Sequence, residues 1–388
     1  MPFIGNKPTA IPLSADDLED NIISTAKIQD NAVTPAKYIE PVPFRNIIIN
    51  GDMSIAQRGT STSSITSGGY YTVDRFQVAP NTMGTWTMSQ DSDVPSGQGF
   101  AKSLKINCTT ADASPSAGDN LTISSNFEGQ MLQYLKKGTS NAESLTLSFW
   151  VKTNKTGTYI AELYDNDNTR TINKSFTVSS ADTWEKKTIT YAGDTTGAFG
   201  NDANNSLGVN FWLGAGTTYT SGTLQTSWGS RVQANRAVGV TNLADSTSNY
   251  INITGVQLEA GTSASDFEFL PYDVNLQRCQ RYYYSFIKNE NNEEIGCGGY
   301  YSSSQIFVDI PFPVTMRANP TLDFTSGTDY YGVYRNGAHD TFNSFTIGQS
   351  GINLIGLYNN SEVSGTAGHS GFFRTNNASS SMAFESEL

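Results

Sequence analysis

Alternating apolar and polar positions predict β-strands through the middle of this chain. Apolar residues occupy every second position of residues 145–151 and again of residues 207–213. Successive side chains of a strand point to opposite faces, so this period of two indicates strands with one face on a core. Similar short runs predict further strands at residues 74–78, 85–89, 103–108, 158–164, 186–191 and 250–258.

The segments between these strands are loops rich in turn-forming residues. Residues 110–120 and 193–205 are dominated by Gly, Asn, Asp and Ser, which serve turns. About nine strands with such spacing, and no long amphipathic helix, indicate an all-β fold. We predict a jelly-roll β-sandwich for residues 46–272.

A second β-rich region follows the sequence Phe269-Leu270-Pro271-Tyr272. Short aromatic and β-branched runs beyond it predict strands at residues 280–287, 305–312, 321–324, 330–334, 342–347, 352–358, 371–375 and 382–385. We predict a smaller β-sandwich for residues 273–388, forming a C-terminal tip.

The N-terminal segment has a different period. Apolar residues stand five apart at Leu13, Leu18, Ile23, Ile28, Val33 and Tyr38. A step of five fits neither a helix nor a strand and is typical of wound repeats, but six units are too few to close a core. Unless this segment is disordered, it pairs with identical copies. We predict an intertwined three-fold stalk over residues 1–45, which ends at Pro41-Val42-Pro43.

Composition and charge exclude two classes of partner. Charged residues make up 15% of the 388 residues, well below the usual quarter, and the formal net charge is -12. Nucleic acid and anionic membranes both require clustered Lys and Arg, so we expect neither as a partner. No apolar run approaches the roughly 20 residues of a membrane span, and residues 1–13 lack the pattern of a secretory signal. Membrane insertion is not expected.

Neither a metal nor a cofactor is predicted. The three cysteines, Cys108, Cys279 and Cys297, lack metal-ligand spacing and form no disulfide framework, so we interpret them as buried apolar thiols. A weaker alternative is a structural calcium ion, because Asp52 and Glu259 are hard oxygen ligands at the two ends of the predicted jelly roll.

Nothing in the sequence indicates catalysis. The two histidines, His339 and His369, lie in Gly- and Asn-rich sequence that reads as loop, and no nucleophile motif accompanies them. We therefore expect a protein that is not an enzyme. A glycan depolymerase remains the third alternative, because sequence cannot supply the separation between two catalytic carboxylates.

Two tryptophans are candidate sugar-binding residues. Trp150 and Trp212 have the opposite parity to the apolar positions of their strands, so both indoles are expected to face away from the core. An indole in that place can stack on a sugar ring. The alternative is burial beneath another subunit or a loop.

The C-terminal region offers a second candidate surface. The aromatic candidates there are Tyr330, Tyr331, Tyr334 and His339, in a segment broken by glycine. Tyrosine gives recognition loops a rigid amphipathic surface, and loops at the end of a sandwich commonly carry binding sites. The alternative is that these tyrosines pack on the core.

Several motifs, in this order, resemble one family. They are Asn46-Ile47-Ile48-Ile49-Asn50-Gly51-Asp52-Met53, Gln57-Arg58-Gly59, Asp74-Arg75-Phe76, Val256-Gln257-Leu258-Glu259, Cys279-Gln280-Arg281-Tyr282-Tyr283, Pro313-Val314-Thr315-Met316-Arg317-Ala318-Asn319-Pro320-Thr321 and Phe384-Glu385-Ser386-Glu387-Leu388. Residues 46–388 thereby resemble bacteriophage tail-fibre and prophage structural proteins. The echo of residues 24–28 in residues 34–38 resembles the N-terminal repeats of phage fibres.

The resemblance implies a homotrimeric virion protein in a tail fibre. Its N-terminus would dock to other tail or adaptor proteins, and its C-terminal tip would meet a host surface polysaccharide or lipopolysaccharide. Adhesion is the expected function. A structural virion decoration or adaptor without a receptor is the first alternative.

Overall fold

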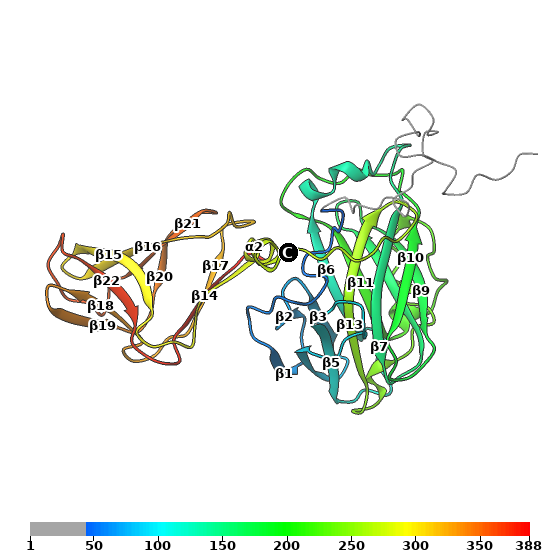
Figure 1. The fold of residues 1–388 in the computed structure, drawn as a ribbon, viewed down its shortest axis with the longest axis horizontal. Helices are drawn as coiled ribbons and strands as arrows, with labels where there is room; N and C mark the ends of the chain where they lie inside the picture. The colour runs from blue at the N-terminus through cyan, green and yellow to red at the C-terminus, as the bar shows by residue number, and fades with distance from the viewer. Residues whose placement is uncertain (1–43) are drawn as a thin grey trace, which may run out of the picture. The chain divides into compact units, whose positions relative to one another are not determined.

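The computed structural model describes residues 44–388 (Figure 1). Residues 1–43 of the predicted stalk lie outside the described residues, and these include Leu13, Leu18, Ile23, Ile28, Val33 and Tyr38. The described chain is almost entirely antiparallel β-sheet, as predicted.

The first two sheets face each other as a jelly-roll sandwich. One sheet has the strand order β1 (Ser61–Ile65), β4 (Thr85–Asp91), β5 (Ser103–Thr110), β13 (Tyr250–Ala260), β7 (Leu145–Thr153) and β10 (Glu185–Tyr191). The other has the order β12 (Gly229–Ser230), β9 (Arg170–Val178), β8 (Gly157–Asp165), β11 (Asn205–Ala215), β6 (Asn120–Glu128), β3 (Gln77–Asn81) and β2 (Gly69–Tyr70). We call these sheet A and sheet B.

The alternating apolar side chains that the sequence analysis identified pack together in this core. The inward side chains of β7 and β11 are buried, and Phe149 meets Phe211 edge to face with ring centroids 4.9 Å apart. Such contacts add to the stabilisation from apolar burial. The loops carry helix α1 (Thr217–Thr220) and the 3-10 turns η4 (Gly129–Met131), η5 (Gln133–Leu135), η6 (Gln233–Asn235) and η7 (Leu243–Asp245).

The C-terminal part has two sheets and a separate core. After helix α2 (Tyr272–Gln280), sheet C has the order β14 (Tyr283–Lys288), β23 (Ser381–Glu385) and β17 (Thr321–Phe324). Sheet D has the order β19 (Ala338–Phe342), β18 (Tyr331–Arg335), β22 (Ser370–Thr375), β15 (Glu294–Ser302), β16 (Gln305–Pro311), β21 (Leu354–Asn359) and β20 (Thr346–Ser350). Tyr331, Phe342 and Phe373 lie at the centre of this core.

Some local predictions are wrong. Residues 342–347 are not one strand, because Phe342 ends β19 and Thr346 begins β20. Residues 74–76 precede β3, and residues 272–280 form a helix that was not predicted. His339 lies in β19 rather than in a loop. Cys108 and Cys279 are buried as expected, whereas Cys297 is exposed.

A charged cluster joins the jelly roll to the segment that begins with helix α2. Glu128, at the end of β6, is fully buried and accepts hydrogen bonds from the Arg281 guanidinium at 2.7 and 2.8 Å and from the Tyr282 hydroxyl at 2.5 Å. Burial raises the pKa of Glu128, but these donors lower it more and hold it below its ordinary value. Arg75, also buried, pairs with Glu387. No helix among residues 44–388 is long and apolar enough to cross a membrane.

Candidate functional site

Trp150 projects from the outer face of sheet A, as its parity predicted. Strand pairing places Lys186 of β10 beside it on one side and Thr254 of β13 on the other. Ser148, two residues earlier on β7, lies on the same face opposite Gln257. These neighbours come from three strands that are far apart in the sequence, so the pairing of the sheet creates the group.

A bulge in β13 opens the surface next to the indole. The register of β13 against β7 shifts between Thr254 and Gln257, and Gly255 lies there with φ +61°. A Cβ atom on Gly255 would lie 2.6 Å from Phe100 Cζ and 3.1 Å from Trp150 Cδ1. Only glycine fits both this backbone conformation and this space.

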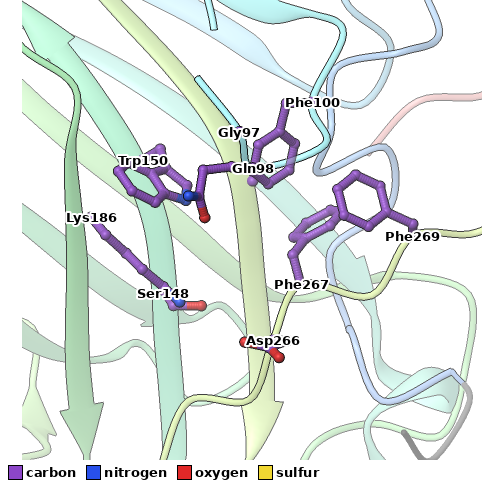
Figure 2. Close-up of a pocket in the computed structure, with 10 residues that line it drawn as sticks. Gly97, Gln98, Phe100, Ser148, Trp150, Lys186, Asp266, Phe267 and Phe269 are labelled. Carbon is purple, nitrogen blue, oxygen red and sulfur yellow. The ribbon is translucent and has the colours of Figure 1, made fainter. Parts of the chain in front are cut away.

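Three phenylalanines form the wall opposite Trp150 (Figure 2). Phe100, Phe267 and Phe269 pack pairwise with ring centroids 4.9–5.1 Å apart. They come from two loops, residues 92–102 and 261–271, which cover the edge of this surface. Mutual packing fixes the orientation of the rings.

The hollow between the indole and this wall has a volume of about 250 Å³. Its lining includes Gln98, Ser148, Lys186 and Asp266. Within residues 44–388, the side chains of these four residues and the Trp150 indole N–H have no hydrogen-bond or ion-pair partner. A small cleft with apolar walls and several unused polar groups has the composition of a ligand site.

Some polar groups elsewhere on this sheet face satisfy one another. Lys152 pairs with Asp93 at 2.7 Å, and the Trp184 indole donates to the same carboxylate at 2.9 Å. Partial burial raises the pKa of Asp93, but these two donors lower it by a larger amount. The pKa therefore lies below its ordinary value, and the carboxyl stays ionised at neutral pH.

Trp212 is not available to a ligand, which corrects the sequence prediction. It lies on the outer face of sheet B but is only 2% exposed, because residues 216–240 of the same chain fold over it. Its indole donates to Glu162 at 3.1 Å, and Arg236 of the covering segment grips the same carboxylate with two bonds of 2.7 Å. We call residues 216–240 the cover segment.

The aromatic candidates of the C-terminal region do not form one site. Tyr331 is fully buried, and its hydroxyl donates to the Thr325 carbonyl at 2.7 Å, so it belongs to the core and is not a contact residue. Tyr330 is half-buried against the same core. Tyr334 and His339 are cross-strand neighbours on sheet D, stacked with centroids 4.0 Å apart, and His339 is exposed.

The weaker calcium hypothesis is not supported by the donor geometry. Asp52 bonds to Ser54 and Asn275, whereas Glu259 bonds to Ser265 and Gln257. Burial raises the pKa of Asp52, which disfavours a charged ligand there. No group of three or more His, Cys, Asp or Glu residues within 44–388 could hold a metal ion.

The sequence predicted the outward orientation of Trp150 and missed its neighbours in the cleft. Lys186 and Gln98 carry no local signal, because only strand pairing and a loop return bring them to the indole. The alternation of Phe267 and Phe269 just after a predicted strand was a usable signal. The spacing indicates that both side chains point to the same side of the chain, but it does not tell which surface of the protein that side meets.

Comparison with known proteins identifies no family. No protein-family model matches the chain, and no curated protein matches it. Among solved structures, one similar chain is the enzymatically active domain of tailspike protein 4 of bacteriophage CBA120, with 14% identity, a TM-score of 0.29 and coverage of 57% of this chain and 22% of that chain. Another is a putative sugar binding protein from Bacteroides thetaiotaomicron, with 13% identity, a TM-score of 0.29 and coverage of 55% and 99%.

A third similar structure is the family 11 carbohydrate-binding module from Clostridium thermocellum in complex with a β-1,3-1,4-mixed-linked tetrasaccharide. Its identity is 9% and its TM-score 0.27, with coverage of 53% of this chain and 98% of the module. The chain thus matches less than a quarter of the tailspike domain and nearly all of the two smaller proteins. TM-scores this low carry no argument about what this chain binds.

Proposed function

We propose that this chain is a virion fibre protein, a homotrimer that attaches a phage to a host surface polysaccharide or lipopolysaccharide without catalysis. The observation that carries glycan recognition is the cleft at Trp150, where an indole meets unpartnered donors and acceptors. A sugar ring offers an apolar face for stacking and a rim of hydroxyls that both donate and accept. The lining of the cleft fits both features.

The size of the cleft suits a single ring of a longer polymer. Its volume of about 250 Å³ is below the roughly 300–1,000 Å³ that holds a drug-sized ligand. The remaining rings would lie outside it, so one site binds weakly. Three copies per fibre and several fibres per particle multiply weak contacts into lasting attachment.

The virion part of the proposal has a separate basis. It rests on the order of motifs through residues 46–388 and on the five-residue ladder of residues 1–45. The ladder would hold the trimer and dock it to a tail or adaptor protein. Localisation in a tail fibre belongs to the same proposal.

The test is binding of the full chain to capsular polysaccharides and lipopolysaccharides, measured by biolayer interferometry with Trp150→Ala beside it. We expect the variant to bind about tenfold more weakly, equivalent to about 1.4 kcal/mol per site. Trp184→Ala is the matched control, because Trp184 lies on the same sheet face but does not line the cleft.

Three outcomes would overturn parts of the proposal. Equal binding by Trp150→Ala and the unaltered chain would place the glycan elsewhere. Release of reducing sugar from the polymer would favour the depolymerase. Particle images with the chain on capsid hexamers, and no adsorption defect without it, would favour a structural decoration.

A further inference from the structure

The cleft at Trp150 contains two charged side chains of opposite sign. Lys186 reaches it from β10 and Asp266 from the loop that follows β13, and they are the only charged residues of the described chain that line it. In Figure 2, Lys186 lies on the Trp150 side of the cleft and Asp266 on the Phe267 side. Neither side chain has a hydrogen-bond or ion-pair partner within residues 44–388. The cleft therefore holds two free charges but has no net charge.

Two ion pairs next to the cleft add no net charge to it. The Arg45 guanidinium donates to the backbone carbonyl of Asp266 and pairs with the Glu259 carboxylate, with 3.5 Å between nitrogen and oxygen. On the side of the strands, Lys152 pairs with Asp93 at 2.7 Å. The charges that a bound ring would meet directly are thus those of Lys186 and Asp266.

An uncharged sugar ring matches these two charges. A hydroxyl group both donates and accepts, so the hydroxyls of one ring can accept from the Lys186 ammonium and donate to the Asp266 carboxylate. Hydrogen bonds to charged groups are roughly twice as strong as those between neutral groups. The Gln98 amide and the Ser148 hydroxyl, which also line the cleft, likewise donate and accept. A ring of hydroxyls can therefore satisfy the whole polar lining.

A charged sugar fits the same lining less well. The carboxylate of an acidic sugar can accept from Lys186, but it has no proton to donate to Asp266 and is repelled by it. The ammonium of an amino sugar pairs with Asp266 but is repelled by Lys186. Beyond the cleft, the formal net charge of -12 repels every acidic repeat of an anionic polymer.

We propose that the Trp150 cleft selects an uncharged sugar ring, a neutral hexose or an N-acetylated amino sugar, and that Lys186 and Asp266 together set this preference. The inference rests on the proposed function and names the class of sugar bound at its site. The indole stacks on a ring whatever the charge of that ring. The two charges discriminate, because each rejects a sugar of its own sign.

The test measures binding of the full chain to the capsular polysaccharides and lipopolysaccharides, each in its native form and after its carboxylates are reduced to alcohols and its phosphates removed. Lys186→Met and Asp266→Asn are measured beside the unaltered chain. We expect binding to uncharged polymers, and about fivefold weaker binding by each variant, because each loses a charge-assisted hydrogen bond. Binding should also be equal at about 50 mM and about 500 mM salt, since no ion pair with the polymer is screened.

Lys136→Met and Asp309→Asn are the matched controls. Both residues are exposed and lie outside the cleft, and the two variants change the net charge of the chain in the same way as the test variants. We expect both controls to bind like the unaltered chain. They separate the local charges of the cleft from the net charge of the molecule.

The sign of each variant's effect distinguishes the outcomes. If Lys186→Met weakens binding and Asp266→Asn strengthens it, the sugar is acidic, and this inference is wrong while the proposed function stands. The reverse pattern indicates a basic sugar and has the same consequence. If neither variant changes binding but Trp150→Ala weakens it, the two charges set no preference and the inference again fails alone. Binding to no polymer, or binding that Trp150→Ala leaves intact, would overturn glycan recognition at the cleft as well.

Discussion

Asp74 is a buried titratable side chain that lies where two parts of the chain meet. It is fully buried, and Gln57 donates to it twice, from the backbone N–H at 2.9 Å and from the side-chain amide at 2.5 Å. The same amide also donates to the Tyr283 carbonyl of β14 at 2.6 Å. Burial raises the pKa of Asp74 from 3.8 to about 6, although Arg58 and Gln57 lower it in part.

This raised pKa predicts a loss of stability between about pH 4 and pH 7. The folded-state pKa lies above the unfolded value, so the stability that the neutral carboxyl contributes is complete below the unfolded pKa and disappears as pH rises through 6. The loss is on the order of 3 kcal/mol. Asp74→Asn cannot ionise, so urea unfolding at pH 4.5 and pH 7 should show a smaller loss in this variant. Identical pH profiles would contradict the assignment.

The cover segment buries part of the outer face of sheet B, including Trp212, and so removes it from solvent. Glu162 on β8 is fully buried, and Asn210 and Trp212 of β11 and Arg236 of the cover segment all donate to it. Burial lowers the pKa of Arg236, but the Glu162 carboxylate, which accepts its hydrogen bonds, raises it more, so the pKa lies above its ordinary value. The negative charge of Glu162 is thus neutralised only while the cover segment is in place. The same ion pair holds the cover segment on the sheet.

We expect Arg236→Met to release the cover segment. The variant leaves a buried carboxylate without its counter-charge, which costs about 3–5 kcal/mol. Acrylamide should then quench more of the tryptophan fluorescence, because Trp212 becomes accessible, and proteases should cut within residues 216–240. Arg231→Met is the control, since the Arg231 guanidinium donates to the Tyr164 hydroxyl rather than to a carboxylate. If both variants behave alike, the ion pair does not hold the segment.

Over the whole described chain, the cluster at Glu128 connects the jelly roll to helix α2 and the C-terminal sheets. Two of its members, Arg281 and Tyr282, belong to the Cys279–Tyr283 motif of the sequence analysis. Ile49, Ile55, Cys279 and Tyr282 form a small apolar cluster of their own. The connection is therefore both packed and charged.

Glu128→Gln should loosen this connection without unfolding the sandwich. The change removes the charge that pairs with Arg281, and we expect about 2–3 kcal/mol of destabilisation. Hydrogen exchange of helix α2 should increase while that of β7 and β11 stays the same. Glu143→Gln, which alters an exposed pair with Lys136, is the control. Unchanged exchange in α2 would refute the role of the cluster.

The sequence predicted strands where side chains alternate strictly and missed them where small or polar residues take inward positions. β6 was missed although Leu121, Ile123 and Phe127 alternate, because the buried Ser125 interrupts the apolar set. β15 was missed because glycines break its period. Trp212 had the predicted parity, but its burial depends on a cover segment that no local pattern reveals. The same limit hid Lys186 and Gln98 from the prediction of the cleft.

The strand order of sheet A has a consequence for how the chain is made. β5 ends at Thr110, and its neighbour β13 begins at Tyr250, about 140 residues later. At roughly 5–20 residues per second, a ribosome needs about 7–28 s to supply that neighbour. During this time the β4–β5 hairpin leaves the ribosome with one side unpaired, so we expect the nascent chain to bind chaperones and its yield in cells to depend on their supply.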